Sequence, residues 1–116
     1  MFFEYLQERD GVSGIETADG FLCYKIFGKQ FYISEFYLKK EKKNNPSAVK
    51  KIFQEVKKIC DENECTTIGC HIDFHNLKFN EVLLSRLKFG FKVSEIKESK
   101  LGLLMPVEGI EKWVQR

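Results

Sequence analysis

A lysine-rich stretch, LKKEKKNNPSAVKKIF at residues 38–53, joins an apolar segment to a long amphipathic one. From Lys39 to Lys58 there are eight lysines against Glu41 and Glu55, a local excess of six positive charges. A strand-to-helix turn of this kind presents unpaired backbone N–H groups and a positive dipole, which together bind phosphate. The stretch predicts an anion site, although a solvated helix face has the same composition.

The turn has no glycine, the residue that lets a backbone approach a phosphate closely. It consists of Asn44-Asn45-Pro46-Ser47. Asparagine tolerates positive φ better than most residues, while Pro46 contributes no N–H. We expect Ser47, Ala48 and Val49 to offer free N–H groups. Because the N–H of Pro46 is missing, the sequence predicts an anion site of weakened affinity.

Two carboxylates, Glu35 and Asp73, are candidates for general acid–base chemistry. Glu35 lies in the apolar segment 30–38, and Asp73 ends segment 66–73 with His71 on the same face. A carboxylate buried in an apolar strand has a raised pKa, which suits general acid–base chemistry. The alternatives are an exposed rim or a lysine partner for Glu35, and an ordinary polar strand end for Asp73 and His71.

The cysteines and histidines are not spaced for a metal. Cys60, Cys65, Cys70, His71 and His75 are close in sequence, but they form no C-x-x-C pair. Cys70 and His71 are neighbours on a predicted strand, so their side chains point to opposite faces. We predict no metal site and four buried free thiols.

Length and composition limit the classes of protein. A chain of 116 residues with 43% apolar and 31% charged residues fits one soluble domain over 1–116. No apolar run approaches the roughly 20 residues of a membrane helix, and the first residues do not resemble a signal peptide, so we expect a cytoplasmic protein without a membrane partner. A net charge of +2 and the lack of a recognised motif argue against nucleic acid as a partner.

The hydrophobic pattern predicts an α/β (α+β) fold. Two main helices are expected at about 46–62 and 79–89, and segment 30–38, apolar on both faces, should lie centrally in the sheet. The order of elements indicates a mixed, mainly antiparallel twisted sheet of five to seven strands. The expected strands are 15–17, 21–27, 30–38, 66–73, 91–97 and 101–107.

The sequence resembles the GNAT superfamily of acetyl-CoA-dependent N-acetyltransferases. Segment 31–53 is similar to that family's central strand, pyrophosphate loop and following helix, and NEVLLSRLKFGFKV (80–93) to a later helix and turn. The resemblance covers about residues 15–105, with the N-terminal strand and helix pair reduced as in small, some of them phage-encoded, members. It implies acetyl-CoA as cofactor, an amine of a small molecule or protein as acceptor, and a sheet that could pair as a homodimer.

The resemblance also assigns residues. The family's loop is Arg/Gln-x-x-Gly-x-Gly/Ala; Lys43 takes its first place, Pro46 departs from the first glycine, and Ala48 agrees with the last position. It implies that a backbone N–H of Tyr37 or Leu38 holds the thioester carbonyl and that Glu35 or Asp73 is the base. The pyrophosphate would be held by Lys43, Asn44, Asn45, Ser47, Ala48 and Val49.

Arg86 occupies the place where the family usually has a tyrosine acid. Because arginine stays charged, it would stabilise a thiolate or phosphate, or be a solvated helix residue. Two hypotheses follow: an active acetyltransferase, or a catalytically degenerate GNAT-fold binding module that no longer uses acetyl-CoA. Pro46, Arg86 and the missing glycines favour the second, whereas the basic helix start and Glu35 favour the first.

Overall fold

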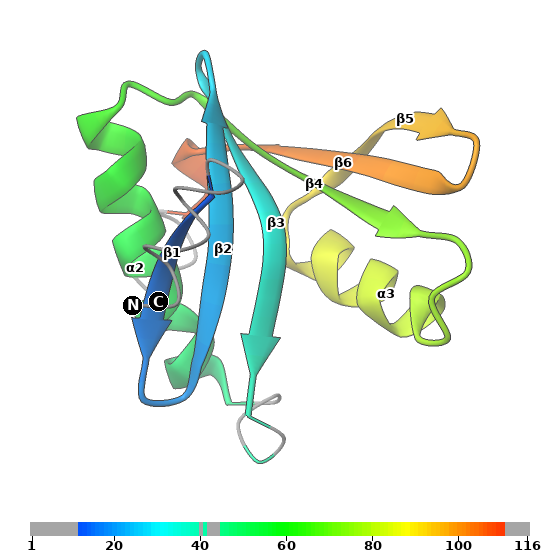
Figure 1. Cartoon of the computed structure of the whole chain (residues 1–116), viewed down its shortest axis with the longest axis horizontal. Helices are drawn as coiled ribbons and strands as arrows, with labels where there is room; N and C mark the ends of the chain where they lie inside the picture. The colour runs from blue at the N-terminus through cyan, green and yellow to red at the C-terminus, as the bar shows by residue number, and fades with distance from the viewer. Residues whose placement is uncertain (1–11, 40, 42–44, 111–116) are drawn as a thin grey trace.

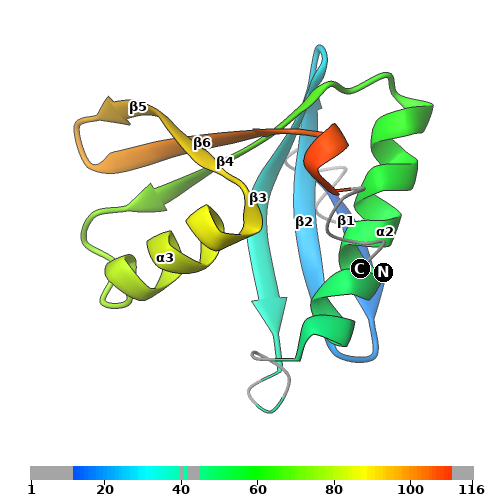
Figure 2. The same cartoon turned by 180° about the vertical axis from the view of Figure 1, so that it is seen from behind.

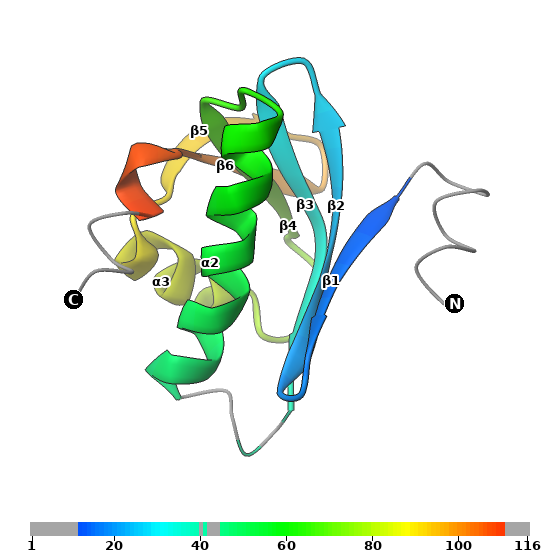
Figure 3. The same ribbon diagram turned by 90° about the vertical axis from the view of Figure 1, so that its left-hand side faces the viewer.

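A six-stranded sheet carries two helices on one of its faces in the computed structural model, which describes residues 12–39, 41 and 45–110. Figure 3 shows α2 and α3 on the same side of the sheet. The predicted mixed fold with helices at 46–62 and 79–89 is confirmed. The elements are β1 (Ser13–Thr17), β2 (Gly20–Phe27), β3 (Gln30–Leu38), α2 (Pro46–Glu62), β4 (Thr67–Asp73), α3 (Phe79–Phe89), β5 (Lys92–Lys97) and β6 (Lys100–Pro106).

The strand order is β1-β2-β3-β4-β6-β5, so β3 lies centrally as predicted. β1, β2 and β3 form an antiparallel meander, and the crossover through α2 makes β4 parallel to β3. β6 then returns between β4 and β5 and is antiparallel to both (Figure 1). Among the described residues, no helix is both long and apolar enough to span a bilayer.

Helix α2 begins and packs as its sequence dictates. Pro46 occupies the first turn, where its missing N–H costs little, and Asn45 caps it. A stripe of buried residues, including Ile52, Phe53 and Val56, faces the sheet. The ring of Phe53 lies 5.7 Å from that of Phe36 on β3 and 4.5 Å from that of Phe89 on α3, so one side chain joins three elements.

All four cysteines, Cys23, Cys60, Cys65 and Cys70, are buried free thiols. Burial raises the pKa of each, and for Cys60 the value reaches about 12. These thiols pack as small apolar side chains and are poor nucleophiles at neutral pH.

Strands β3 and β4 pair over three residues and then diverge (Figure 1). The pairs join Gln30–Tyr32 to residues 67–69, and we call this short paired segment the seam. Just beyond it β3 carries a bulge: Tyr24 pairs with Ile33 and Cys23 with Glu35, which leaves Ser34 without an opposite residue. A bulge bends its strand and increases its twist, so β3 turns away from β4 at this point.

Candidate functional site

A groove of about 640 Å³ lies on the helix face of the sheet. Figure 2 shows the end of β3 passing between the start of α2 and α3 at this place. The floor of the groove is apolar and includes Ile33, Phe36 and Phe53. Its rim is charged and includes Lys78, Glu81 and Lys88. The bulge produces this floor, because after Ser34 the even-numbered residues Phe36 and Leu38 take over the helix face from Phe31 and Ile33. The groove therefore reaches from the helix start to the divergence of β3 and β4.

Arg86 of α3 lies at the inner end of this groove. Its guanidinium carbon is 5.5 Å from the centre of the Phe36 ring on β3. Burial raises the pKa of the Cys70 thiol on β4, and the charge and hydrogen bond of Arg86 offset part of that rise. Arg86 is half-buried and lies between the two diverging strands. Its side chain therefore points toward the sheet, and Arg86 is not a solvated helix residue.

The N-terminus of α2 has already used its nearest backbone donors. The side-chain oxygen of Asn45 accepts the N–H of Ser47 at 2.9 Å, and its carbonyl accepts the N–H groups of Ala48 at 3.2 Å and Val49 at 3.4 Å. The expectation that these three groups are free is therefore wrong, because Asn45 folds back over the helix start. Lys43 and Asn44, also predicted to hold the pyrophosphate, lie outside the described residues.

Residues 35, 37 and 38 of β3 have different environments. Glu35 is exposed on the face of the sheet opposite the helices, which we call the distal face. Of the alternatives that the sequence allowed, the exposed position is observed and the buried carboxylate is not. Tyr37 is 49% exposed and stacks on Phe21 with the ring centres 5.3 Å apart. Leu38 is buried and lines the groove. Of these side chains, only Leu38 contributes to the groove.

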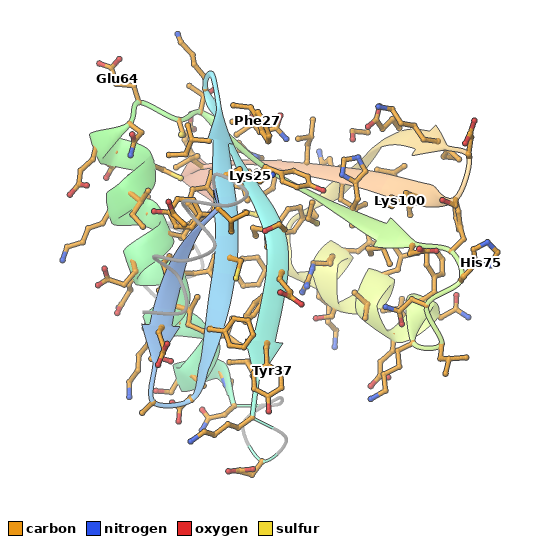
Figure 4. All side chains as sticks on the ribbon, viewed as in Figure 1. Lys25, Phe27, Tyr37, Glu64, His75 and Lys100 are labelled. Carbon is orange, nitrogen blue, oxygen red and sulfur yellow. The ribbon has the colours of Figure 1, made fainter. Side chains whose placement is uncertain are left out.

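Asp73 is exposed at the end of β4 and accepts the backbone N–H of His75 at 2.8 Å. It therefore caps the turn after the strand. Figure 4 shows Tyr37 and His75 at the far ends of the two diverging strands, well apart. Glu35 and Asp73 both lie beyond the seam, where β3 and β4 diverge, so the structure does not bring the two predicted carboxylates together.

Sequence reasoning missed a hydrogen-bonded group at the seam. On the distal face, Nδ1 of His71 is 3.0 Å from the hydroxyl of Tyr32, and Nε2 is 3.0 Å from Oε1 of Glu95. The partners of His71 are 39 and 24 residues away in sequence, and only the observed strand order brings the three together.

No protein-family profile matches the sequence, and no curated protein matches it. Solved structures do. The N-acetyltransferase PaiA from Thermoplasma acidophilum, in complex with coenzyme A, has a TM-score of 0.68 at 19% identity, over 89% of this chain and 67% of that one. A chain described as a GNAT-family acetyltransferase from Desulfovibrio desulfuricans has a TM-score of 0.72 at 12% identity, over 90% and 74% of the two chains. A GNAT-family acetyltransferase from Elizabethkingia anophelis with acetyl-CoA bound has a TM-score of 0.63 at 11% identity, over 89% and 82%.

Proposed function

Because this chain has the GNAT fold, we propose that it is an N-acetyltransferase that uses acetyl-CoA to acetylate an amine of a small molecule or protein. The observation that carries the proposal is the groove that ends at the divergence of β3 and β4. A ligand lying in the groove would reach the gap between the strands, where the amine can approach from the distal face.

The groove fits the two chemically different ends of acetyl-CoA. Beyond Tyr32, no described strand pairs with the β4 side of β3, so that edge is available to an extended ligand with amide groups. The floor beside it is apolar. At the outer end stands the N-terminus of α2, whose dipole and nearby lysines attract phosphate groups. The arm of acetyl-CoA that carries amide groups would therefore lie along the unpaired edge of β3, and its phosphates would lie at the N-terminus of α2.

Acetyl-CoA supplies an activated acetyl thioester. The charged guanidinium of Arg86 lies at the inner end of the groove, where it would stabilise negative charge on the departing sulfur. A backbone N–H at Tyr37 or Leu38 is proposed to hold the thioester carbonyl. The resemblance assigns the base to Glu35 or Asp73, but Glu35 is exposed on the distal face and Asp73 is engaged in its turn.

The degenerate binding module remains a second candidate, and one observation favours it. The N–H groups of Ser47, Ala48 and Val49 are occupied, and Pro46 has none. An anion at this helix start must displace the Asn45 side chain before it meets a free donor. The balance between that cap and a bound pyrophosphate decides between the two functions.

Titration of acetyl-CoA into the full chain, followed by calorimetry and thermal shift, tests the proposal. We expect binding in the micromolar range and stabilisation of about 2.7 kcal/mol when the ligand is at 100 times its dissociation constant. Ser85→Trp, which fills the groove from α3, should abolish binding. Leu84→Trp is the matched control, because residue 84 is on the same helix, 65% exposed and outside the groove. No binding by the unmodified chain at millimolar acetyl-CoA would overturn the proposal in favour of the binding module.

A further inference from the structure

Three side chains from three strands form a continuous hydrogen-bonded chain on the distal face. Tyr32 of β3, His71 of β4 and Glu95 of β5 are joined by two contacts of 3.0 Å. Tyr32 alternates along β3 with Phe31 and Ile33, which face the helices, so its ring is on the distal face. His71 is likewise opposed to its neighbour Cys70, which contacts Arg86 of α3.

The contacts fix where the protons are. The hydrogen bond from His71 and the charge of Lys97 lower the pKa of the Glu95 carboxyl, more than its slight burial raises it, so Glu95 is ionised and accepts from Nε2–H. In a neutral imidazole the other nitrogen, Nδ1, is then an acceptor, and the hydroxyl of Tyr32 donates to it. Burial raises the pKa of Tyr32, which keeps that hydroxyl protonated.

The backbone is shaped to allow this arrangement. Gly102 of β6 lies opposite His71 and between it and β5. A Cβ at position 102 would be 2.6 Å from Cγ of Glu95 and 3.3 Å from Nε2 of His71. A bulge at Ser94 places Glu95 directly opposite Gly102. The missing side chain at 102 lets Glu95 reach across β6 to His71.

This chain of groups is adjacent to the gap that the groove enters from the other face. Tyr32 is the last residue of β3 that pairs with β4, and the next residue, Ile33, lines the groove. An acetyl group at the inner end of the groove and an amine on the distal face would therefore meet beside Tyr32. Resting on the proposed function, we propose that Tyr32, His71 and Glu95 form a proton relay that deprotonates the incoming alkylammonium acceptor.

The relay moves one proton per transfer. A proton leaves the ammonium nitrogen for the oxygen of Tyr32 while the hydroxyl proton of Tyr32 passes to Nδ1 of His71, and the amine keeps the electron pair that forms the new C–N bond. Glu95 holds the imidazolium that results. As the C–S bond breaks, a second proton from the nitrogen neutralises the thiolate, and His71, whose side chain is 28% exposed, returns the first proton to solvent.

Tyr32 is the catalytic residue of the relay, whereas His71 and Glu95 act through it as positioning residues. Among the described residues, His71 contacts Tyr32 on β3 and Glu95 on β5, Lys97 lies beside Glu95, and Asp73 is two residues along β4. Asp73 is held in its turn by His75, so Glu95 is the carboxylate that contacts the imidazole.

Two probe amines of similar size test the relay. Ethylamine is protonated at neutral pH, since an alkylamine has a pKa near 10.4, whereas the fluorines of 2,2,2-trifluoroethylamine keep most of that amine unprotonated. With saturating acetyl-CoA, Tyr32→Phe should lower the transfer rate to ethylamine by about 10²-fold and barely change the rate to trifluoroethylamine. Tyr24→Phe, the same change on the helix face of β2, is the control and should leave both rates unchanged.

Further variants separate the relay from simple packing. Glu95→Gln and His71→Gln should reduce transfer to ethylamine while acetyl-CoA binding, measured by calorimetry, stays unchanged. Equal loss toward both amines, or full activity of Tyr32→Phe with ethylamine, overturns the relay alone. A chain that binds acetyl-CoA but acetylates neither amine also overturns the relay, and a chain that does not bind acetyl-CoA overturns the proposed function with it.

Discussion

The side-chain oxygen of Asn45 accepts the backbone N–H of Ser47 at 2.9 Å, so the chain itself occupies the first donor of α2. The same helix is capped at its other end by Asn63, whose side-chain amide donates to the carbonyl of Ile59 at 2.8 Å. The first cap competes with any phosphate at the helix start. The second has no such competitor.

Asn45→Ala should therefore lower stability and raise affinity together. Loss of the cap costs about 1 kcal/mol of unfolding free energy, while the freed N–H of Ser47 becomes available to the pyrophosphate. Denaturant unfolding and acetyl-CoA calorimetry measure the two effects. Asn63→Ala is the control, expected to lower stability without changing affinity. If Asn45→Ala weakens binding instead, the Asn45 side chain itself contacts the ligand.

Pro46→Ala should strengthen acetyl-CoA binding, because it adds an N–H at a helix position that has no intrahelical acceptor. A new hydrogen bond to an anion is worth about 1.5–3 kcal/mol, or roughly tenfold to a hundredfold in the dissociation constant. Pro46→Gly adds the same N–H with a freer backbone, so comparison of the two variants separates the donor from flexibility. Calorimetry showing unchanged affinity in both would show that no phosphate lies against this turn.

Arg86→Met should lower the acetyl-transfer rate by about 10²-fold, since it removes the positive charge at the inner end of the groove. Arg86→Lys keeps the charge and should retain more of the rate. Acetyl-CoA binding should change little in either variant, which distinguishes loss of charge from collapse of the groove. Lys92→Met removes an exposed charge on β5 and serves as the control. A fully active Arg86→Met would show that Arg86 only packs on Phe36.

Alkaline pH should destabilise the protein through Cys60. Burial raises the thiol pKa to about 12 in the folded state, against about 8.5 for an unperturbed thiol. The contribution is complete below the lower value and is lost as pH rises toward the upper one, at up to about 1.4 kcal/mol per pH unit. Urea unfolding at pH 8, 9 and 10 measures the slope. Cys60→Ala should be less stable at pH 8 but less sensitive to pH, and an unchanged slope would assign the effect to other groups.

The sequence predicted those elements whose residues interact with near neighbours. Helix α2 was found at its observed bounds, because Pro46 and the periodic apolar residues define it locally. The helix and turn around Gly90 were found for the same reason: that glycine has a φ of 116° and ends α3. The central position of β3 followed from a segment that is apolar on both faces.

The parts of the site that depend on register were not predictable from a single sequence. The bulge at Ser34 reverses the side-chain alternation of β3, and neither residue type nor spacing indicates it. The insertion of β6 between β4 and β5 brings Glu95 to His71 across Gly102, a relationship that no local pattern contains. The contacts of Asn45 with the N–H groups of Ser47, Ala48 and Val49 occupy the donors that the anion site needs, and the residue type alone does not indicate this.

The seam divides the sheet into two sets of strands, β1-β2-β3 and β4-β6-β5. Each set is bonded internally along most of its length, whereas three residue pairs connect the two. In the described part of the chain, further contacts between the sets include the hydrogen bond of Tyr32 to His71, Arg86 between Phe36 and Cys70, and the ring of Phe53 against Phe36 and Phe89. Few backbone hydrogen bonds therefore resist a change in the angle between the two sets. Backbone amides along the gap should exchange hydrogen faster than those within each set, and a molecule lodged between β3 and β4 would slow that exchange.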